Sequence, residues 1–212
     1  MANIVRRQIL EDGPRNTIIK IAGILDTSDI AATGEIGASG FTTTAGSRNV
    51  AFVAGALVPT VGQYVTFSDT AATFVAGTYI TAVTDATHIV VSTAALKDNA
   101  AAAVAITGTA GAIVILDPAF LEQIGAREGL ANRLAVVEIE YTVEAALAVY
   151  LYFEATANAL IAPLQGWGEL EPCVPINNIE ATGVTGKIVL STQGQAGTLS
   201  FTVLLCVKKY QK

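Results

Sequence analysis

The stretch VVEIEYTVE, residues 136–144, gives the clearest strand signal in the chain. Glu138, Glu140 and Glu144 fall on one parity of this segment and apolar residues fill the other. Because successive side chains of a β-strand point to opposite faces, one face is expected in a core and the other in solvent. The glutamates are interpreted as the solvated face, and a pair of carboxylates for glycosidase chemistry is the alternative interpretation.

Similar runs of alternating or β-branched residues recur along the chain, at 17–21, 65–68, 78–84, 187–190 and 199–207. Gly, Asn, Asp and Pro punctuate them every ~8–15 residues, which is typical of a β-sandwich or barrel. The sequence therefore predicts an all-β fold built on an antiparallel, jelly-roll-like β-sandwich. One short helix is expected at 117–124, because Asp117 is a suitable N-cap, Pro118 fits the first turn and Gly125 can end it.

Composition divides the chain into a discontinuous host domain, residues 1–33 and 112–212, and an insert, residues 34–111. The insert is rich in Gly, Ala, Thr and Val, has very few charges and is bordered by glycines. Exposed loop tips tolerate insertions, so we expect a small β-domain spliced into a loop of the host and projecting outward. Its pattern predicts an antiparallel barrel or sandwich, with strands at 61–67, 76–84 and 88–91.

Low charge dominates the composition of the 212 residues: 14% are charged, 52% are hydrophobic and the formal net charge is −6. A weakly charged surface protects poorly against self-association, so association is expected. The negative balance argues against a nucleic-acid partner, and Lys208-Lys209 is interpreted as a solvated tail. No membrane span or signal peptide is predicted, and Cys173 and Cys206 are expected as core residues of a protein made in a reducing cytoplasm.

Catalytic motifs are not evident in the sequence. The single histidine, His88, lies in a predicted hairpin turn without a nucleophile motif near it, and one His with two distant Cys does not predict a zinc site. The segment Asp26-Thr27-Ser28-Asp29 lacks the glycine and final glutamate of a calcium loop, and it is interpreted as a turn. The sequence predicts a non-enzymatic protein with no cofactor and no metal.

The only tryptophan, Trp167, is followed by Glu169 and Glu171. This combination is interpreted as an interface loop, with a sugar-binding groove as the alternative. At the other end of the chain, Arg6 and Arg7 precede a sharply punctuated turn, Asp12-Gly13-Pro14-Arg15-Asn16. A polar, turn-rich segment in an otherwise weakly charged chain is interpreted as a contact arm.

This turn, with the strand after it and Gly23-Ile24-Leu25-Asp26-Thr27-Ser28-Asp29, resembles the start of a group of small tailed-bacteriophage virion proteins, the capsid decoration or cement proteins. The likeness continues in the runs 139–153, 183–192 and 197–203. It covers about the first 33 and last 100 residues and leaves out the insert.

The resemblance implies a structural role on the virion, made in the host cytoplasm and located on the outer capsid surface. Its implied partners are the major capsid protein and further copies of itself, as a homotrimer that holds neighbouring capsomers together. Capsid or subunit contacts are expected at Arg6, Arg7, Asp12, Arg15, Asp26, Asp29 and Trp167. Nucleic acid and membrane are not expected partners, and the insert is a candidate for weak glycan contact. A tail or baseplate component, another virion component and a glycan-binding β-module are the alternatives.

Overall fold

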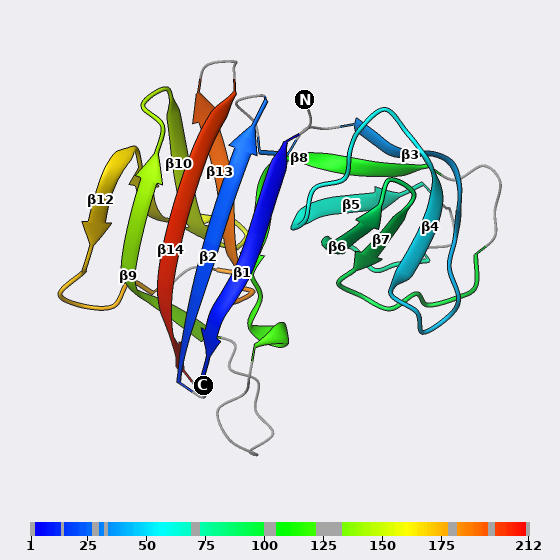
Figure 1. Cartoon of the computed structure of the whole chain (residues 1–212). Helices are drawn as coiled ribbons and strands as arrows, with labels where there is room; N and C mark the ends of the chain where they lie inside the picture. Colours follow the sequence, from blue (N-terminus) through cyan, green and yellow to red (C-terminus); the bar gives the residue numbers. More distant parts are fainter. Residues whose placement is uncertain are drawn as a thin grey trace. The chain divides into compact units, whose positions relative to one another are not determined.

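The computed structural model describes residues 3–13, 15–26, 30–31, 34–68, 73–99, 105–121, 133–177, 182–194 and 198–210. These residues form two antiparallel sheets and one short 3₁₀ turn, with no α-helix among them (Figure 1). The predicted all-β class is therefore confirmed. None of the described residues belongs to a helix long and apolar enough to span a membrane.

The strands, in chain order, are β1 (Ile4–Asp12), β2 (Asn16–Leu25), β3 (Gly34–Thr42), β4 (Asn49–Ala54), β5 (Gln63–Phe67), β6 (Ile80–Asp85), β7 (His88–Val91), β8 (Ile106–Leu116), β9 (Arg133–Val143), β10 (Leu147–Phe153), β11 (Ala159–Leu164), β12 (Gly166–Leu170), β13 (Ile188–Gly194) and β14 (Leu199–Tyr210). The chain divides into two compact units. Unit 1 comprises Met1–Asn3 and Asp29–Ile113, and unit 2 comprises Ile4–Ser28 and Val114–Lys212.

Unit 2 contains a five-stranded antiparallel sheet with the order β1-β2-β14-β9-β12. The period of two predicted for these strands is seen directly in β2, where every second residue is buried. Ile19 and Ile21 of β2 lie in the core beside Val203 and Leu205 of β14, all with no solvent exposure. Ile139 of β9 is also fully buried, as the alternation of VVEIEYTVE predicts.

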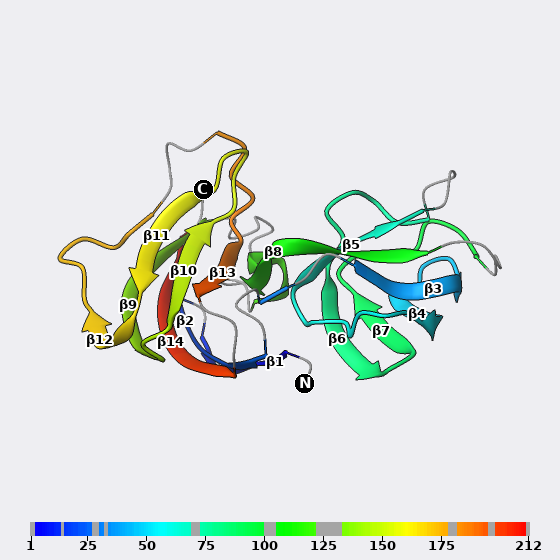
Figure 2. The ribbon, with the colours of Figure 1, turned by 90° about the horizontal axis from the view of Figure 1, so that it is seen from above.

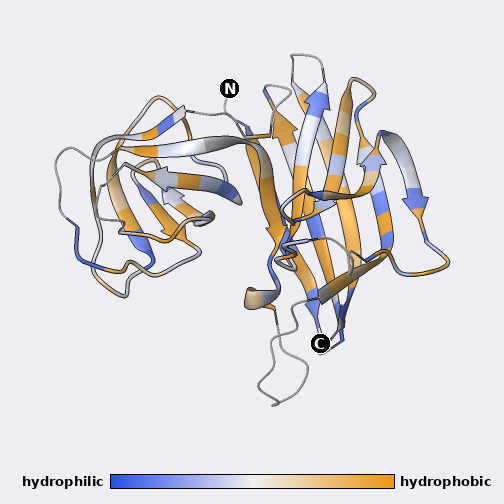
Figure 3. Ribbon diagram, turned by 180° about the vertical axis from the view of Figure 1, so that it is seen from behind, coloured by the Kyte–Doolittle hydropathy of each residue, from blue (hydrophilic) through white to orange (hydrophobic). Residues whose placement is uncertain are grey.

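A second layer covers the inner face of this sheet in unit 2 (Figure 2). Its central strand β10 pairs with β11 on one side and β13 on the other, both antiparallel. Four residues of β10 are buried, Leu147, Val149, Leu151 and Phe153, and they alternate with half-buried ones. Figure 3 shows the corresponding alternation of hydrophobic and hydrophilic residues along the strands. This two-layer arrangement is sandwich-like.

A close approach between β2 and β14 requires a glycine at position 23. Gly23 pairs with Phe201, whose ring lies directly over the glycine backbone. A Cβ added at Gly23 would lie 2.3 Å from a ring carbon of Phe201, which is too close for any side chain. The glycine therefore allows a large aromatic residue to pack against the sheet itself.

Unit 1 has its own hydrophobic core, built around aromatic residues. Phe67 stacks on Phe74 with ring centroids 4.5 Å apart, and it contacts the fully buried Phe41 at 5.0 Å. Buried Ile and Val residues from the strands of unit 1 surround these rings. Such offset and tilted ring pairs are favourable beyond the apolar area they bury.

The strands of unit 1 do not close into a barrel, so the barrel form of the sequence prediction is wrong. The path β3-β4-β7-β6 runs outward from β8, which also pairs with β5. Closure would need continuous pairing between β5 and β6. In the described residues, the two segments are joined by the isolated Tyr64–Tyr79 bridge and by backbone hydrogen bonds from Gly62 to Ile80 and from Val65 to Thr78, and they form no continuous ladder.

The helix predicted at 117–124 is reduced to a 3₁₀ turn, Pro118–Phe120. The predicted cap is present, because the Asp117 carboxylate accepts a hydrogen bond from the Ala119 backbone N–H at 2.9 Å. The α-helix prediction is nevertheless wrong at Leu121, which has an extended backbone and is almost fully buried. Burying Leu121 directs the chain out of the helical path, and positions 122–124 lie outside the described residues.

Candidate functional site

The outer face of the five-stranded sheet is the side that points away from the core of unit 2. Ala22 and Ile24 of β2 and Thr202 and Leu204 of β14 lie on this face, alternating with the buried residues. Several of its apolar side chains are largely exposed, including Ile24 at 51% and Ile4 of β1 at 52%. This exposure makes the outer face a candidate interaction surface, since large apolar side chains gathered on one face commonly mark contact sites.

Trp167 is the most exposed large hydrophobic residue of the described chain, at 85%. It lies on the edge strand β12 opposite Thr142, while Glu169 lies two residues on opposite Glu140. Between them, Gly168 is covered by the ring of Tyr141, whose hydroxyl would lie 2.8 Å from an added Cβ. The period of two therefore directs Trp167 and Glu169 to the outer face together.

A shallow depression of about 350 Å³ lies beside Trp167 on this face. Trp167 and Glu169 border it from β12, and Glu140, Thr142, Thr202 and Leu204 line it from the neighbouring strands. It therefore combines one aromatic face with carboxylate and hydroxyl groups. Such a surface can bind an apolar group against the indole ring. The carboxylates beside it can bind a basic or hydrogen-bonding group of the same ligand.

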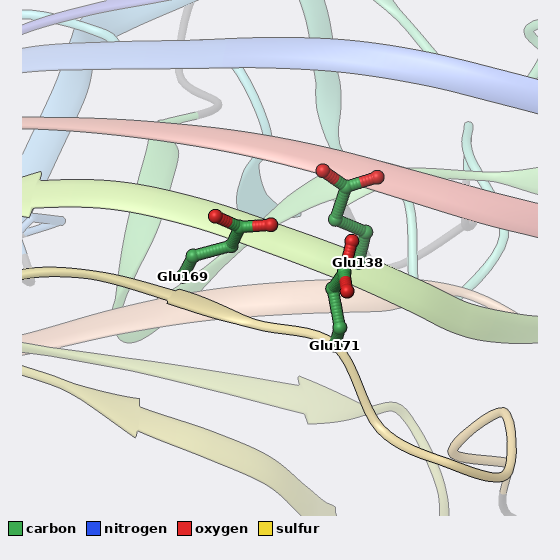
Figure 4. Close-up of side chains that lie close together, drawn as sticks. All are labelled: Glu138, Glu169 and Glu171. Carbon is green, nitrogen blue, oxygen red and sulfur yellow. The ribbon is translucent and has the colours of Figure 1, made fainter.

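Three carboxylates lie close together here, and one of them, Glu169, also borders the depression (Figure 4). One ligand oxygen of each of Glu138, Glu169 and Glu171 lies within 4.8 Å of the others. The negative charge of Glu171 raises the pKa of Glu169 above its ordinary value, with smaller contributions from burial and from Glu138. Carboxylate oxygens suit hard divalent cations, but exposed acidic groups often gather without an ion, and no metal is assigned here.

A second depression, of about 410 Å³, lies on the same face toward β1. Its walls are formed by Ile4, Arg6, Ala22, Ile24, Ser200 and Thr202. Arg6 and Lys20 are exposed on this half of the face. Glu11 is an exposed acidic residue on the same half of the face. We call this part the basic half, and the part formed by Glu138, Glu140, Glu169 and Glu171 the acidic half.

The arginines of the predicted contact arm point in different directions. Arg6 lies on the outer face and borders the second depression. Arg7 has the opposite parity and is half-buried, with Nη1 donating to the Ile115 carbonyl at 3.4 Å. Arg15 is exposed in the β1–β2 turn, where its carbonyl accepts a hydrogen bond from the Lys209 N–H at 2.7 Å. The structure therefore does not bring these three side chains to one surface.

Asp12 contacts residues within the fold. Its carboxylate forms an ion pair with Lys209 and accepts a hydrogen bond from the Thr17 hydroxyl at 2.8 Å. Lys209 also donates to the Gly13 carbonyl at 2.8 Å, and its side chain is fully buried. The interpretation of Lys208-Lys209 as a solvated tail is wrong for Lys209, which continues the inward parity of β14.

The remaining predicted positions are spread over the chain. Asp26 is half-buried directly after β2, and Asp29 lies outside the described residues. Both cysteines are free thiols, and the expectation that they lie in the core is wrong for both, since Cys173 is exposed and Cys206 has the outward parity of β14. Cys206 is half-buried on the outer face, where burial raises the pKa of its thiol.

His88 begins β7 at the predicted hairpin turn. Its Nδ1 lies 2.9 Å from the Asp85 carboxylate, and the Thr87 N–H donates to the same carboxylate at 2.7 Å. The hydrogen bond from His88, followed by those from Thr87, lowers the pKa of Asp85 to about 2. These contacts link the two ends of a tight turn, which is a structural arrangement.

No family model, curated protein or solved structure matches this chain.

Sequence reasoning identified Trp167 but not the surface around it. The second depression and the division into basic and acidic halves depend on the strand order β1-β2-β14-β9-β12. A local signal for part of it was available, because Lys20, Ala22 and Ile24 share one parity of β2. That parity shows which residues face the same way, but not which strands lie beside them.

Proposed function

We propose that the protein is a non-enzymatic structural component of a phage virion that binds the outer surface of the capsid as an oligomer and stabilises the shell. The observation that carries this proposal is the outer face of unit 2, where an 85% exposed Trp167 lies on the same sheet face as exposed Ile4 and Ile24. A surface of this kind is suited to burial against other protein, with aromatic residues as anchors. The turn and strand motifs that resemble capsid decoration proteins support the same function.

In this proposal unit 2 is a jelly-roll-like sandwich, and its partners are the major capsid protein and other copies of the chain in a homotrimer. Residues 34–111 form a small β-sandwich domain. Repeated contacts across a capsid lattice convert modest individual affinities into effectively permanent attachment. The low overall charge and the exposed apolar residues of the outer face fit this mode of binding, which depends on contact area and on many simultaneous sites.

The first test is the copy number of the chain in purified particles, measured by quantitative mass spectrometry against the major capsid protein. A ratio near one to one is expected for a shell-covering protein. A few copies per particle would overturn the capsid role and favour a tail or baseplate component. Absence from particles would overturn a virion role altogether.

A second test measures binding of the purified chain to particles that lack it. Alanine at Arg6 and Arg15, which are exposed, is expected to weaken binding and to make the remaining binding less sensitive to salt, because a screened attraction is lost. Arg7→Ala is expected to act mainly on stability, because Arg7 is half-buried and contacts Ile115. Unchanged affinity in the Arg6 and Arg15 variants would remove the contact-arm part of the proposal.

A glycan-binding module is the second candidate, favoured by the depression beside Trp167. An exposed indole flanked by Glu169, Glu140 and Thr142 offers a stacking surface with hydrogen-bond acceptors around it. Binding of neutral oligosaccharides would quench or shift the Trp167 fluorescence in the isolated chain. No spectral change across an oligosaccharide panel would reject this candidate without affecting the capsid proposal.

A further inference from the structure

Trp167 is a projecting hydrophobic residue that its own molecule leaves uncovered. It lies on the edge strand β12, and its side chain is 85% exposed. Exposed tryptophans carry a large hydrophobic area, ~150–250 Å² when buried, and frequently anchor protein interfaces. Glu169 and Glu171 follow it in the chain and give the surface around it a negative charge.

A hollow of opposite character lies elsewhere on the same outer face. It is the depression of about 410 Å³ lined by Ile4, Ala22, Ile24 and the Arg6 side chain. The hollow adjoins the depression beside Trp167, since Thr202 lines both. Its walls on β1 and β2 are nevertheless too far for Trp167 of the same molecule to cover, because β12 is separated from β2 by β9 and β14, which at the usual strand spacing is about 14 Å. An occupant must therefore come from another molecule.

The charges around the two surfaces are complementary. Arg6 borders the hollow, and Lys20 is exposed on β2 two residues from Ala22, which lines it. Around Trp167 the charged groups are carboxylates, those of Glu138, Glu140, Glu169 and Glu171. Glu11 partly offsets the basic half, which leaves it with an excess of positive charge. The acidic half of one copy therefore attracts the basic half of another.

We propose that Trp167 of one copy inserts into the hollow of a second copy, with Arg6 of that copy held between the indole ring and Glu169. Arg over an indole face is a favourable cation–π arrangement, and the nearby carboxylate pairs with the guanidinium. Ile4 and Ile24 supply the apolar walls that the indole covers. The occupant of this hollow is thus a second copy of this chain.

The contact joins two different surfaces, so each copy has one Trp167 to insert and one hollow to fill. A closed ring, or a two-fold pair that makes the contact twice, satisfies every copy. A three-membered ring agrees with the homotrimer of the proposed function. This inference rests on the proposed function only for the expectation that the chain self-associates. The tests below use the isolated full chain, so their failure and failure to bind capsids are separate results.

The single tryptophan provides a direct measurement. In sedimentation velocity over a concentration series, we expect a monomer that converts to a discrete oligomer. The Trp167 emission maximum should shift to shorter wavelength over the same concentration range, because the indole becomes buried. A monomer at all concentrations would overturn the proposal, as would an oligomer whose Trp167 emission stays that of an exposed indole.

Substitutions then test the two sides of the contact. Trp167→Ala should raise the dissociation constant at least ~30-fold, the size typical of an interface anchor. Leu160→Ala is the matched control, since Leu160 is 52% exposed on β11 of the other layer and should leave association unchanged. Circular dichroism of both variants checks the fold. Equal effects of the two substitutions would contradict the assigned contact.

A charge exchange tests the pairing itself. Arg6→Glu and Glu169→Arg should each weaken association ~10-fold or more, and the double variant should recover to within a few-fold of the original. All three variants retain Trp167, so the emission of this residue reports its burial in every sample. Loss in both single variants without recovery in the double variant would overturn the pairing of Arg6 with Glu169.

Discussion

Lys209 and Asp12 form an ion pair across 197 residues of sequence, with the lysine side chain completely buried. The pair joins the last strand to the first hairpin of unit 2. Thr17 and the Gly13 carbonyl complete the hydrogen bonding of the two charged groups. A buried charge with this many partners depends on all of them, because the interior solvates an unpaired ion poorly.

Lys209→Met is expected to lower the free energy of unfolding by about 3–5 kcal/mol, since it leaves the Asp12 carboxylate half-buried and without its ion partner. Urea denaturation followed by circular dichroism measures the change. Lys208→Met is the matched control, because Lys208 is the exposed neighbour on the same strand and should change stability by less than about 0.5 kcal/mol. Similar losses in both variants would argue against a specific role of the buried pair.

Gly23→Ala is expected to destabilise unit 2 by about 1–3 kcal/mol through overpacking against Phe201. The added Cβ would lie 2.3 Å from the ring, so the ring or the strand must move. Adding Phe201→Leu should recover part of the loss by making room. Gly34→Ala provides the comparison, because its Cβ meets Leu57 at an ordinary 3.5 Å. Thermal melts of the three variants and of the original chain give the result.

The acidic half predicts a pH effect centred on Glu169. Its pKa is raised mainly by Glu171, so the folded state binds a proton more readily than the unfolded chain. Folding therefore gains stability at pH below the ordinary glutamate range, and this gain is lost as pH rises through the folded pKa. Glu171→Gln should bring the pKa of Glu169 closer to its ordinary value in a carboxyl NMR titration. Glu11→Gln, on the same face, should leave it unchanged.

Asp85 predicts the opposite dependence in unit 1. Its pKa is lowered from 3.8 to about 2, first by the hydrogen bond from His88. This turn contributes stability above pH 3.8 that is lost as pH falls toward 2. His88→Ala should move the Asp85 titration back toward the ordinary aspartate range, as measured by NMR. A titration that does not move would show that the Thr87 hydrogen bonds alone account for the shift.

The strands were predictable from sequence because a period of two is a local property. VVEIEYTVE needs no partner to show which residues face inward, and Ile139 is buried as its parity requires. The same parity in Val203, Leu205 and Val207 extends to Lys209, so its burial could have been inferred. In the sequence prediction the charge of Lys209 was given more weight than its inward parity, because the sequence does not show that its partner is Asp12, 197 residues away.

The candidate site was less predictable, because it depends on which strands are neighbours. The hollow exists only where β1, β2 and β14 lie side by side, and no local pattern encodes that order. The helix prediction failed for a related reason. Asp117 and Pro118 supply sound local capping signals, but the turn ends at Leu121, which is buried and has an extended backbone.

The position of β14 has a consequence for how the chain is made. This strand, the last of the fourteen, lies between β2 and β9 in the middle of its sheet. During synthesis the hairpin β1–β2 emerges first but must wait for residues 199–210 before its inner neighbour arrives. Unit 1, whose strands lie within Asp29–Ile113, can complete its core long before that. Unit 1 can therefore fold during synthesis, whereas the sheet of unit 2 can be completed only after its central strand β14 has been made.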